Sequence, residues 1–113
     1  MPFAFGDIYL VEFDPSVGHE YQNIRPGFVI QEEEISKISP YITVLPITSQ
    51  IEKHAGVDVF IERDNKNRLS VDSIIKVRHI SSFDKSRFMH FIGKAGSPTI
   101  RQVRGYLRRH FGL

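Results

Sequence analysis

The apolar runs upstream of residue 97 are all short, and this shortness limits the folds open to the chain. The first run, DIYLVEF at 7–13, carries apolar side chains at both parities, which predicts a strand covered on both faces. Each run is bounded by Gly, Pro, Asp, Asn or Ser, residues typical of turns. Further strands are predicted at 27–31, 41–49, 57–62, 73–77 and 88–93, with one short helical turn at 81–87.

The pattern changes period at the C-terminus. Ser97 is placed as an N-cap, Pro98 as the first helical residue and Gly112 as the stop signal. Short strands followed by one terminal helix predict a mainly β (α+β) class: a small curled sheet or barrel of five to six antiparallel strands with a C-terminal α-helix. The apolar face of this helix is predicted from the spacing of Ile100, Val103, Leu107 and Phe111.

Composition narrows the possible functions. The chain has 113 residues, 41% hydrophobic and 25% charged, which predicts one globular domain over 1–113. It has no cysteine, so disulfides, thiolate metal sites and thiol nucleophiles are excluded, and the five histidines show no paired metal spacing. We therefore expect no metal and no cofactor. With no signal peptide and no membrane-length apolar run, a cytoplasmic location is expected. The charge of +2 mildly favours a polyanionic partner.

The segment GHEYQNIRP at 18–26 gathers polar side chains between the first two predicted strands. Arg25 precedes Pro26, which favours extended geometry, and its planar guanidinium suits two phosphate oxygens. His19 and Glu20 are the nearest acid–base candidates. The alternative is an ordinary surface loop in which Arg25 pairs with Glu20.

Three other features have competing interpretations. Thr48 and Ser49 could donate to a phosphate or cap the chain locally. The run 32–34, all Glu, is predicted as a solvated loop that would repel RNA. A stripe of basic residues on the C-terminal helix is a solvated face, an RNA rim or a dock for an acidic protein segment; it consists of Arg101, Arg104 and Arg108, with Arg109 beside it.

The opening of the chain resembles that of the MazF/PemK family of toxin endoribonucleases. VLPITSQ is similar to the family's third-strand motif, and ISSFDKSRF with IGKAGSPTIRQVRGYLRRHFGL resembles its closing section. The resemblance therefore spans nearly the whole chain. In the opening, the matching positions are Gly6, Asp7, Asp14, Pro15, Gly18, Glu20, Arg25 and Pro26.

This resemblance implies an SH3-like barrel, a homodimer and a cognate antitoxin. It implies metal-independent cleavage of single-stranded RNA by the substrate's own 2′-hydroxyl, giving a 2′,3′-cyclic phosphate and a 5′-hydroxyl. Arg25 and Thr48 match the family's catalytic Arg and Thr, with Ser49 assisting. His19 is the expected proton-transfer residue, and Glu20 orients Arg25.

One region departs from the family pattern. Where some members carry an Arg and a catalytic Asp, this chain has Lys76 and Arg78, which shifts the expected role of base to His19 or His79. The departure leaves open a weakened enzyme or a pure RNA-binding module, and fold analogy leaves open a gyrase-directed toxin resembling CcdB. The expected RNA contacts are Glu20, Gln22, Asn23, Ser49, Gln50, Lys76, Arg78 and His79.

Overall fold

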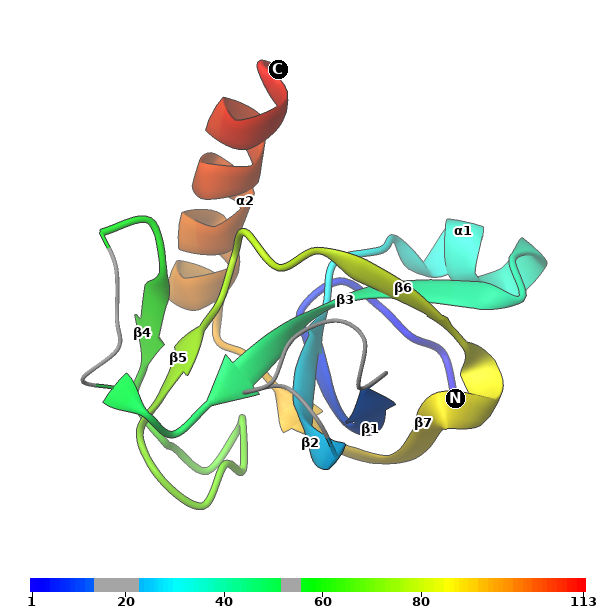
Figure 1. The fold of residues 1–113 in the computed structure, drawn as a ribbon, viewed down its shortest axis with the longest axis horizontal. Coiled ribbons are helices and arrows are strands. Elements are labelled where there is room, and N and C mark those ends of the chain that lie inside the picture. The colour runs from blue at the N-terminus through cyan, green and yellow to red at the C-terminus, as the bar shows by residue number, and fades with distance from the viewer. Residues whose placement is uncertain (14–22, 52–55) are drawn as a thin grey trace.

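The computed structural model describes residues 1–13, 23–51 and 56–113. It contains seven strands and two α-helices in the described residues, drawn in Figure 1. In chain order they are β1 (Asp7–Phe13), β2 (Asn23–Val29), α1 (Glu33–Ile38), β3 (Tyr41–Thr48), β4 (Val59–Ile61), β5 (Ser73–Ile75), β6 (Ser81–Asp84), a 3-10 turn (Lys85–Arg87), β7 (Phe88–Lys94) and α2 (Ser97–Phe111).

The long strand β3 organises an antiparallel sheet with the order β4-β5-β3-β2-β1-β7. Its first half pairs with β6 and its second half with β5, and it runs across the whole sheet in Figure 1. Pro46 lies where the partner changes, and its carbonyl accepts the Lys76 backbone N–H at 3.0 Å. No ladder joins β4 to β7 among the described residues, so the sheet curls without closing.

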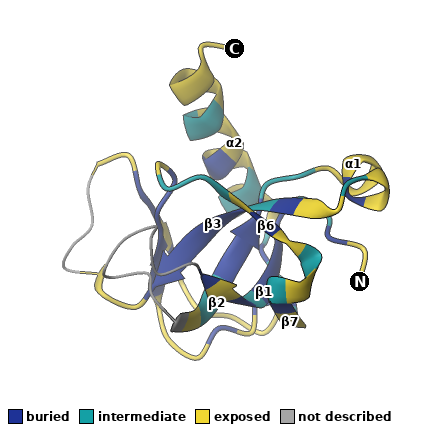
Figure 2. Ribbon diagram, turned by 45° about the vertical axis from the view of Figure 1, so that its right-hand side comes forward, coloured by how far each residue is buried: buried dark blue, intermediate teal, exposed yellow. Residues whose placement is uncertain are grey.

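Both faces of the central strands are buried, as predicted for 7–13. Alternate residues of β1, β2 and β3 point to opposite sides. One side packs into a core with Ile8 and Phe28, and the other into a core with Tyr9 and Val44. Figure 2 shows this buried band running through the sheet, with exposed residues at its margins. The mainly β class with a C-terminal helix is therefore confirmed.

Three sequence predictions were wrong in detail. Residues 23–26 belong to β2 rather than to a loop, because β1 continues the ladder as far as Phe13 opposite Asn23. The Glu run does not form a loop: Glu33 and Glu34 begin α1, where acidic side chains favour the helix N-terminus. Residues 81–84 form strand β6, and only 85–87 make the predicted turn.

That turn is capped by Asp84. Its carboxylate accepts the Ser86 backbone N–H at 2.9 Å. This hydrogen bond lowers the pKa of Asp84, which the Ser86 side chain and Arg87 lower further. The cap fixes the corner at which β6 passes into β7.

Helix α2 packs its first half against the sheet. Val103 is fully buried, and Ile100 and Leu107 cover the same core. Gly96 rather than Ser97 is the N-cap, whereas Gly112 ends the helix in the left-handed conformation as predicted. Phe111 is exposed because the helix extends past the sheet edge (Figure 2). No described helix is long and apolar enough to span a membrane.

A second tie between α2 and the rest of the chain involves the basic stripe. Arg104 donates to the Glu32 carboxylate at 3.0 Å, and its guanidinium lies 3.8 Å from the centre of the Phe5 ring. Arg104 is exposed, as are Arg101 and Arg108, but its guanidinium is also engaged within its own chain.

Gly93 on β7 is the glycine most tightly enclosed by backbone. A Cβ there would lie 2.6 Å from the Lys66 carbonyl oxygen and still closer to the Asn67 carbonyl oxygen. The turn at 66–67 cannot retreat easily, because Lys66 also accepts the Lys94 N–H at 3.0 Å. Close packing of this turn against β7 therefore requires glycine.

We expect Gly93→Ala to lower the free energy of unfolding by about 1–3 kcal/mol through overpacking. The matched control is Gly105→Ala on α2, where a Cβ would meet nothing within 4 Å. That change should stabilise the protein by about 0.5–1 kcal/mol through helix propensity. Urea denaturation of both variants measures the difference, and equal effects would contradict the close approach at Gly93.

Candidate active site

The register of the sheet brings Arg25 and Thr48 together. β2 and β3 pair as Phe28 opposite Leu45 and Gly27 opposite Pro46. The ladder ends at the second of these pairs, and continuing its antiparallel register by two residues would set Arg25 opposite Thr48. Directly opposed residues point to the same face, so both belong on the face that carries Gly27. The sequence prediction had these two residues in separate motifs, and the sheet makes them neighbours.

The same row continues across the next two strands. Thr48 lies opposite Ile74 on β5, and Ile74 lies opposite Phe60 on β4. Phe60 is 48% exposed on the edge strand, so a free aromatic ring stands at the end of the row. A half-buried guanidinium, a hydroxyl and an aromatic ring therefore lie along one line on one face. Sequence reasoning missed Phe60, because an alternating strand pattern does not say what covers its outer face.

The hydroxyl of Thr48 makes one local bond. Its Oγ1 accepts the Gln50 backbone N–H at 3.1 Å, which is the cap predicted as the alternative to a phosphate contact. An accepting hydroxyl keeps its own proton to donate, so the two roles are compatible. Ser49 and Gln50 are both exposed. By strand alternation, Ser49 belongs to the opposite face from Thr48.

Lys76 lies one row away from Arg25 and Thr48, since its backbone N–H bonds the Pro46 carbonyl. Its positive charge is balanced by an acidic side chain. Its ammonium is 2.9 Å from the Asp58 carboxylate, and the two side chains are only 8% and 0% exposed. A direct contact between Lys76 and RNA would require the ammonium to leave Asp58. Asp58, 18 residues upstream, is thus an acid beside this strand, but its carboxylate is bound to the Lys76 ammonium.

Of the remaining predicted site residues, some lie outside the described residues and others are placed by the structure. His19, Glu20 and Gln22 lie outside the described residues. Asn23 begins β2 opposite Phe13. Arg78 is exposed just after β5, and His79 is half-buried beside it, with its backbone N–H donating to Lys76 at 3.1 Å. The structure therefore puts Arg25 on β2 and Thr48 at the end of the neighbouring strand β3, and Arg78 and His79 just after β5.

A hollow of about 460 Å³ lies on the other side of the β2–β3 strand ends. Pro26, Ile47 and Ser49 line it from the strands, and Arg25 reaches its rim. The turn after β4 adds Arg68, a residue that the sequence analysis assigned only to a turn cluster. Its backbone is left-handed, with φ of 58°.

Buried Asn67 holds Arg68 in this unusual conformation. Its side-chain oxygen accepts the N–H groups of Asp64 and Leu69 at 3.1 and 2.9 Å, and its amide donates to the Glu62 carbonyl at 2.8 Å. Such a braced, strained turn is common beside functional sites. A second guanidinium is thus held near the strand ends that carry Arg25.

The described residues offer no site for a metal ion. Within 1–13, 23–51 and 56–113, no three His, Asp or Glu side chains gather as ligands. The chemistry of the described residues rests on a guanidinium, a hydroxyl and exposed basic groups.

We expect Lys76→Met to destabilise the fold by about 3–5 kcal/mol, because it leaves the buried Asp58 carboxylate without its ammonium. The double variant Lys76→Met/Asp58→Leu should recover most of this loss, since no buried charge remains. Urea denaturation of wild type, both single variants and the double variant measures the coupling. Additive losses would show that the pair is not coupled.

Comparison with solved structures supports the fold. A crystal structure of MazF from Deinococcus radiodurans superposes with a TM-score of 0.81 at 24% identity, covering 97% of this chain and 96% of that one. A MazE–MazF structure from the same organism gives a TM-score of 0.79 at 23% identity, covering 100% and 98%.

Sequence comparison identifies the family. A curated relative, Endoribonuclease MazF of Staphylococcus saprophyticus, is 31% identical over 109 residues, covering 96% of this chain and 90% of the relative. Residues 4–111 match the model of the PemK-like, MazF-like toxins of type II toxin–antitoxin systems. The row of Arg25 and Thr48 therefore lies in a chain that belongs to the PemK-like, MazF-like toxin family.

Proposed function

We propose that this chain is a sequence-selective, metal-independent endoribonuclease toxin that cuts single-stranded RNA in the cytoplasm. The observation that carries the proposal is the β2–β3 register, whose continuation would set Arg25 opposite Thr48. Two donors on one face of a rigid sheet suit the non-bridging oxygens of one phosphodiester. The similarity to an endoribonuclease over nearly the whole chain supports the same assignment.

The proposed reaction uses the ribose 2′-hydroxyl of the substrate as nucleophile. A base removes its proton, the 2′-oxygen bonds to phosphorus, and the bond from phosphorus to the 5′-oxygen breaks in line. Arg25 stabilises the negative charge that builds on the non-bridging oxygens, and Thr48 donates its hydroxyl proton as a hydrogen bond to one of them. An acid protonates the leaving 5′-oxygen. The products are a 2′,3′-cyclic phosphate and a 5′-hydroxyl.

The proton-transfer residue is proposed to be His19, with Glu20 orienting Arg25. His79 is the second candidate, because it follows β5 on the segment that leaves the row. Asp58 is a poor base in this arrangement, since its side chain is fully buried against the Lys76 ammonium. The pair instead removes a free lysine charge from beside Arg25, so that the guanidinium is the main cation facing the phosphate.

The RNA chain is proposed to cross the sheet along this row. Phe60 offers a ring on which a base can stack. Arg78 supplies a charge for the flanking phosphates on the β5 side, and Arg68 supplies one on the β2–β3 side. Polar groups at the strand ends, Gln22, Asn23, Ser49 and Gln50, would contact neighbouring bases or sugars.

Two protein partners are also proposed. The MazE–MazF structures similar to this chain support a cognate antitoxin that covers the RNA site, and family membership supports a homodimer. An antitoxin segment rich in acidic residues would meet the exposed Arg101 and Arg108 of α2. Arg104 is less available to it, because it already binds Glu32.

We expect Arg25→Ala to lower kcat for RNA cleavage by about 10²–10³ or more, because it removes the principal charge on the phosphate. The control is Lys37→Gln on α1, an exposed lysine whose loss changes the net charge equally. Cleavage of oligoribonucleotides in EDTA, with the product ends analysed, measures the effect. Undiminished cutting by the Arg25 variant would refute its role.

The two alternative functions predict other results. Salt-sensitive RNA binding with no product in wild type would favour the RNA-binding module, and growth arrest with intact RNA would favour a gyrase-directed toxin.

Thr48→Val should lower kcat by about 10–100-fold with little change in KM, because it removes a hydrogen bond that strengthens in the transition state. Thr48→Ser keeps the hydroxyl and should retain most of the activity. Single-turnover cleavage at saturating protein, with circular dichroism as a fold control, separates the two variants. Equal activity of the Val and Ser variants would remove Thr48 from the mechanism.

A further inference from the structure

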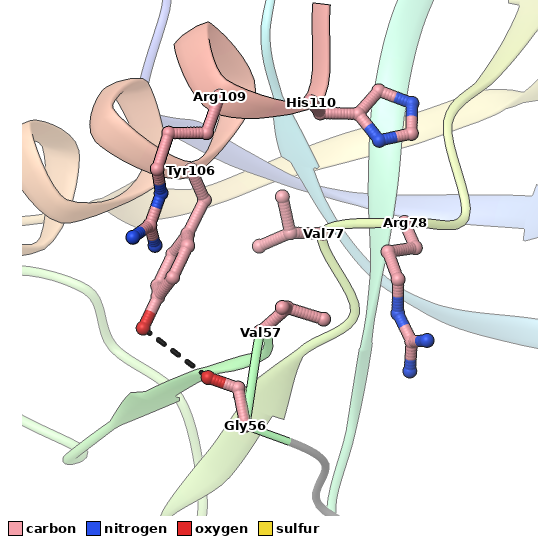
Figure 3. Close-up of a pocket in the computed structure, with 7 residues that line it drawn as sticks. All are labelled: Gly56, Val57, Val77, Arg78, Tyr106, Arg109 and His110. Carbon is pink, nitrogen blue, oxygen red and sulfur yellow. Dashed lines mark hydrogen bonds between the residues drawn. The ribbon is translucent and has the colours of Figure 1, made fainter.

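A second hollow, of about 510 Å³, lies where the chain enters β4 and leaves β5, against the outer half of α2. Gly56 and Val57 line it before β4, and Val77 and Arg78 after β5. Tyr106, Arg109 and His110 of α2 complete it (Figure 3). It belongs to the far end of the β4–β5 pair from the turn that carries Arg68, so it is distinct from the hollow beside β2 and β3.

The base of this hollow is apolar and firmly held. Val77 is buried, and Val57 is 39% exposed although it is apolar. The Tyr106 hydroxyl donates to the Gly56 carbonyl at 3.3 Å, which fastens α2 to the strand entry. In Figure 3, the two valines lie between the Tyr106 ring on one side and Arg78 and His110 on the other.

The rim of the hollow is basic. Arg78, Arg109 and His110 are exposed, and no acidic side chain occurs among the described lining residues. Asp58, the acid next to Val57, is already bound to Lys76. The Arg109 guanidinium lies 4.6 Å from the centre of the Tyr106 ring, so a cation and an aromatic ring form one wall. The hollow therefore combines an apolar base, an aromatic ring and basic side chains on opposite sides of its rim.

This combination fits one nucleotide. A base has a planar apolar face for the Tyr106 ring and the valines, and a phosphate matches guanidinium donors. The volume lies within the usual range for small-ligand sites, roughly 300–1,000 Å³. A second copy of the chain would bring like charges together if this face met itself across a twofold axis. The cations also surround one space, whereas an acidic peptide needs them spaced along a groove.

We propose that this hollow is a nucleotide-binding subsite for single-stranded RNA, in which Tyr106 stacks a base and Arg78 and Arg109 bind its phosphate. The inference rests on the proposed function, because the same RNA would bind both sites. The row of Arg25 and Thr48 faces away from the core that α2 covers, so the RNA chain would pass around the β4–β5 edge to reach the subsite. The Lys76 backbone N–H donates to the carbonyl of Pro46, two residues before Thr48. Arg78 follows Lys76 by two residues. The subsite lies away from the reacting phosphate, so it contributes to RNA binding and not to the chemical step.

The test compares Arg109→Gln, Tyr106→Leu and Tyr106→Phe, with Lys37→Gln as the charge-matched control on α1. RNA affinity is measured by fluorescence anisotropy with a mixed-sequence single-stranded oligoribonucleotide, in an Arg25→Ala background that does not cut it. Arg109→Gln should weaken binding about fivefold to tenfold and reduce the slope of log K against log salt by about 0.7, the value for one lost phosphate contact on a single strand.

Tyr106→Leu should weaken binding about tenfold without changing the salt slope, since stacking carries no charge. Tyr106→Phe keeps the ring and should bind nearly as wild type, which a purely structural role of the Gly56 hydrogen bond would not allow. In the active background, Arg109→Gln should raise KM and leave kcat unchanged.

Unchanged RNA affinity and salt slope in Arg109→Gln, or an identical effect of Lys37→Gln, would overturn the proposal. Binding of an oligoglutamate peptide that depends on Arg109, with no such dependence for RNA, would instead show a peptide site and also overturn it. The binding arm needs no cleavage, so a chain that fails to cut RNA but shows the Arg109 dependence would refute the ribonuclease and leave the subsite standing.

Discussion

The burial of β3 on both faces is the constraint on which the site depends. Val44 packs into one core and Leu45 into the other, so a shift of one residue would move every side chain to the wrong face. The correct register places Thr48 on the face of Arg25, and a slipped one would put Ser49 there. Adjacent hydroxyls that are equivalent in the sequence are thus given different positions by apolar packing far from either of them.

The same register bears on Lys76, one of the positions at which this chain departs from the family pattern. In the row next to Arg25 and Thr48, a free ammonium would compete with the guanidinium for a phosphate. Asp58 binds it at 2.9 Å with both side chains buried, which replaces a mobile surface charge by a fixed structural pair. Breaking one partner of such a pair is costly, and the pair ties the entry of β4 to the exit of β5.

The sequence predicted elements whose signal is local. Period-two runs predicted most of the strands, and the period of α2 with Gly112 after it predicted the helix and its end. Segment α1 has only six residues and begins inside the run of three glutamates, and β6 has a single large apolar residue, Phe83, so neither carries a periodic signal. The start of β2 depends on pairing with β1, which no pattern within 18–26 encodes.

The site divides in the same way. Arg25 and Thr48 could be predicted because each lies in a recognisable motif, although their proximity could not. Asp58 and Tyr106 act through partners distant in the chain: Asp58 binds Lys76, and Tyr106 binds Gly56. Such pairings arise only when the sheet and helix are assembled. Arg68 depends on the local turn that Asn67 braces. Sequence reasoning therefore gave the proposed reacting groups and missed the groups around them.

The arrangement also separates chemistry from binding. The row of Arg25 and Thr48 is held on central strands with two buried faces, where donors can be aligned to the small tolerance that a transition state requires. The exposed cations stand on the projecting half of α2 and on the segment after β5, where a long anionic chain can be attracted without precise alignment. Val103 fixes α2 to the core, so the two regions keep a constant spacing. On the proposed function, a phosphodiester chain that binds both regions would be oriented before its scissile bond reaches Arg25.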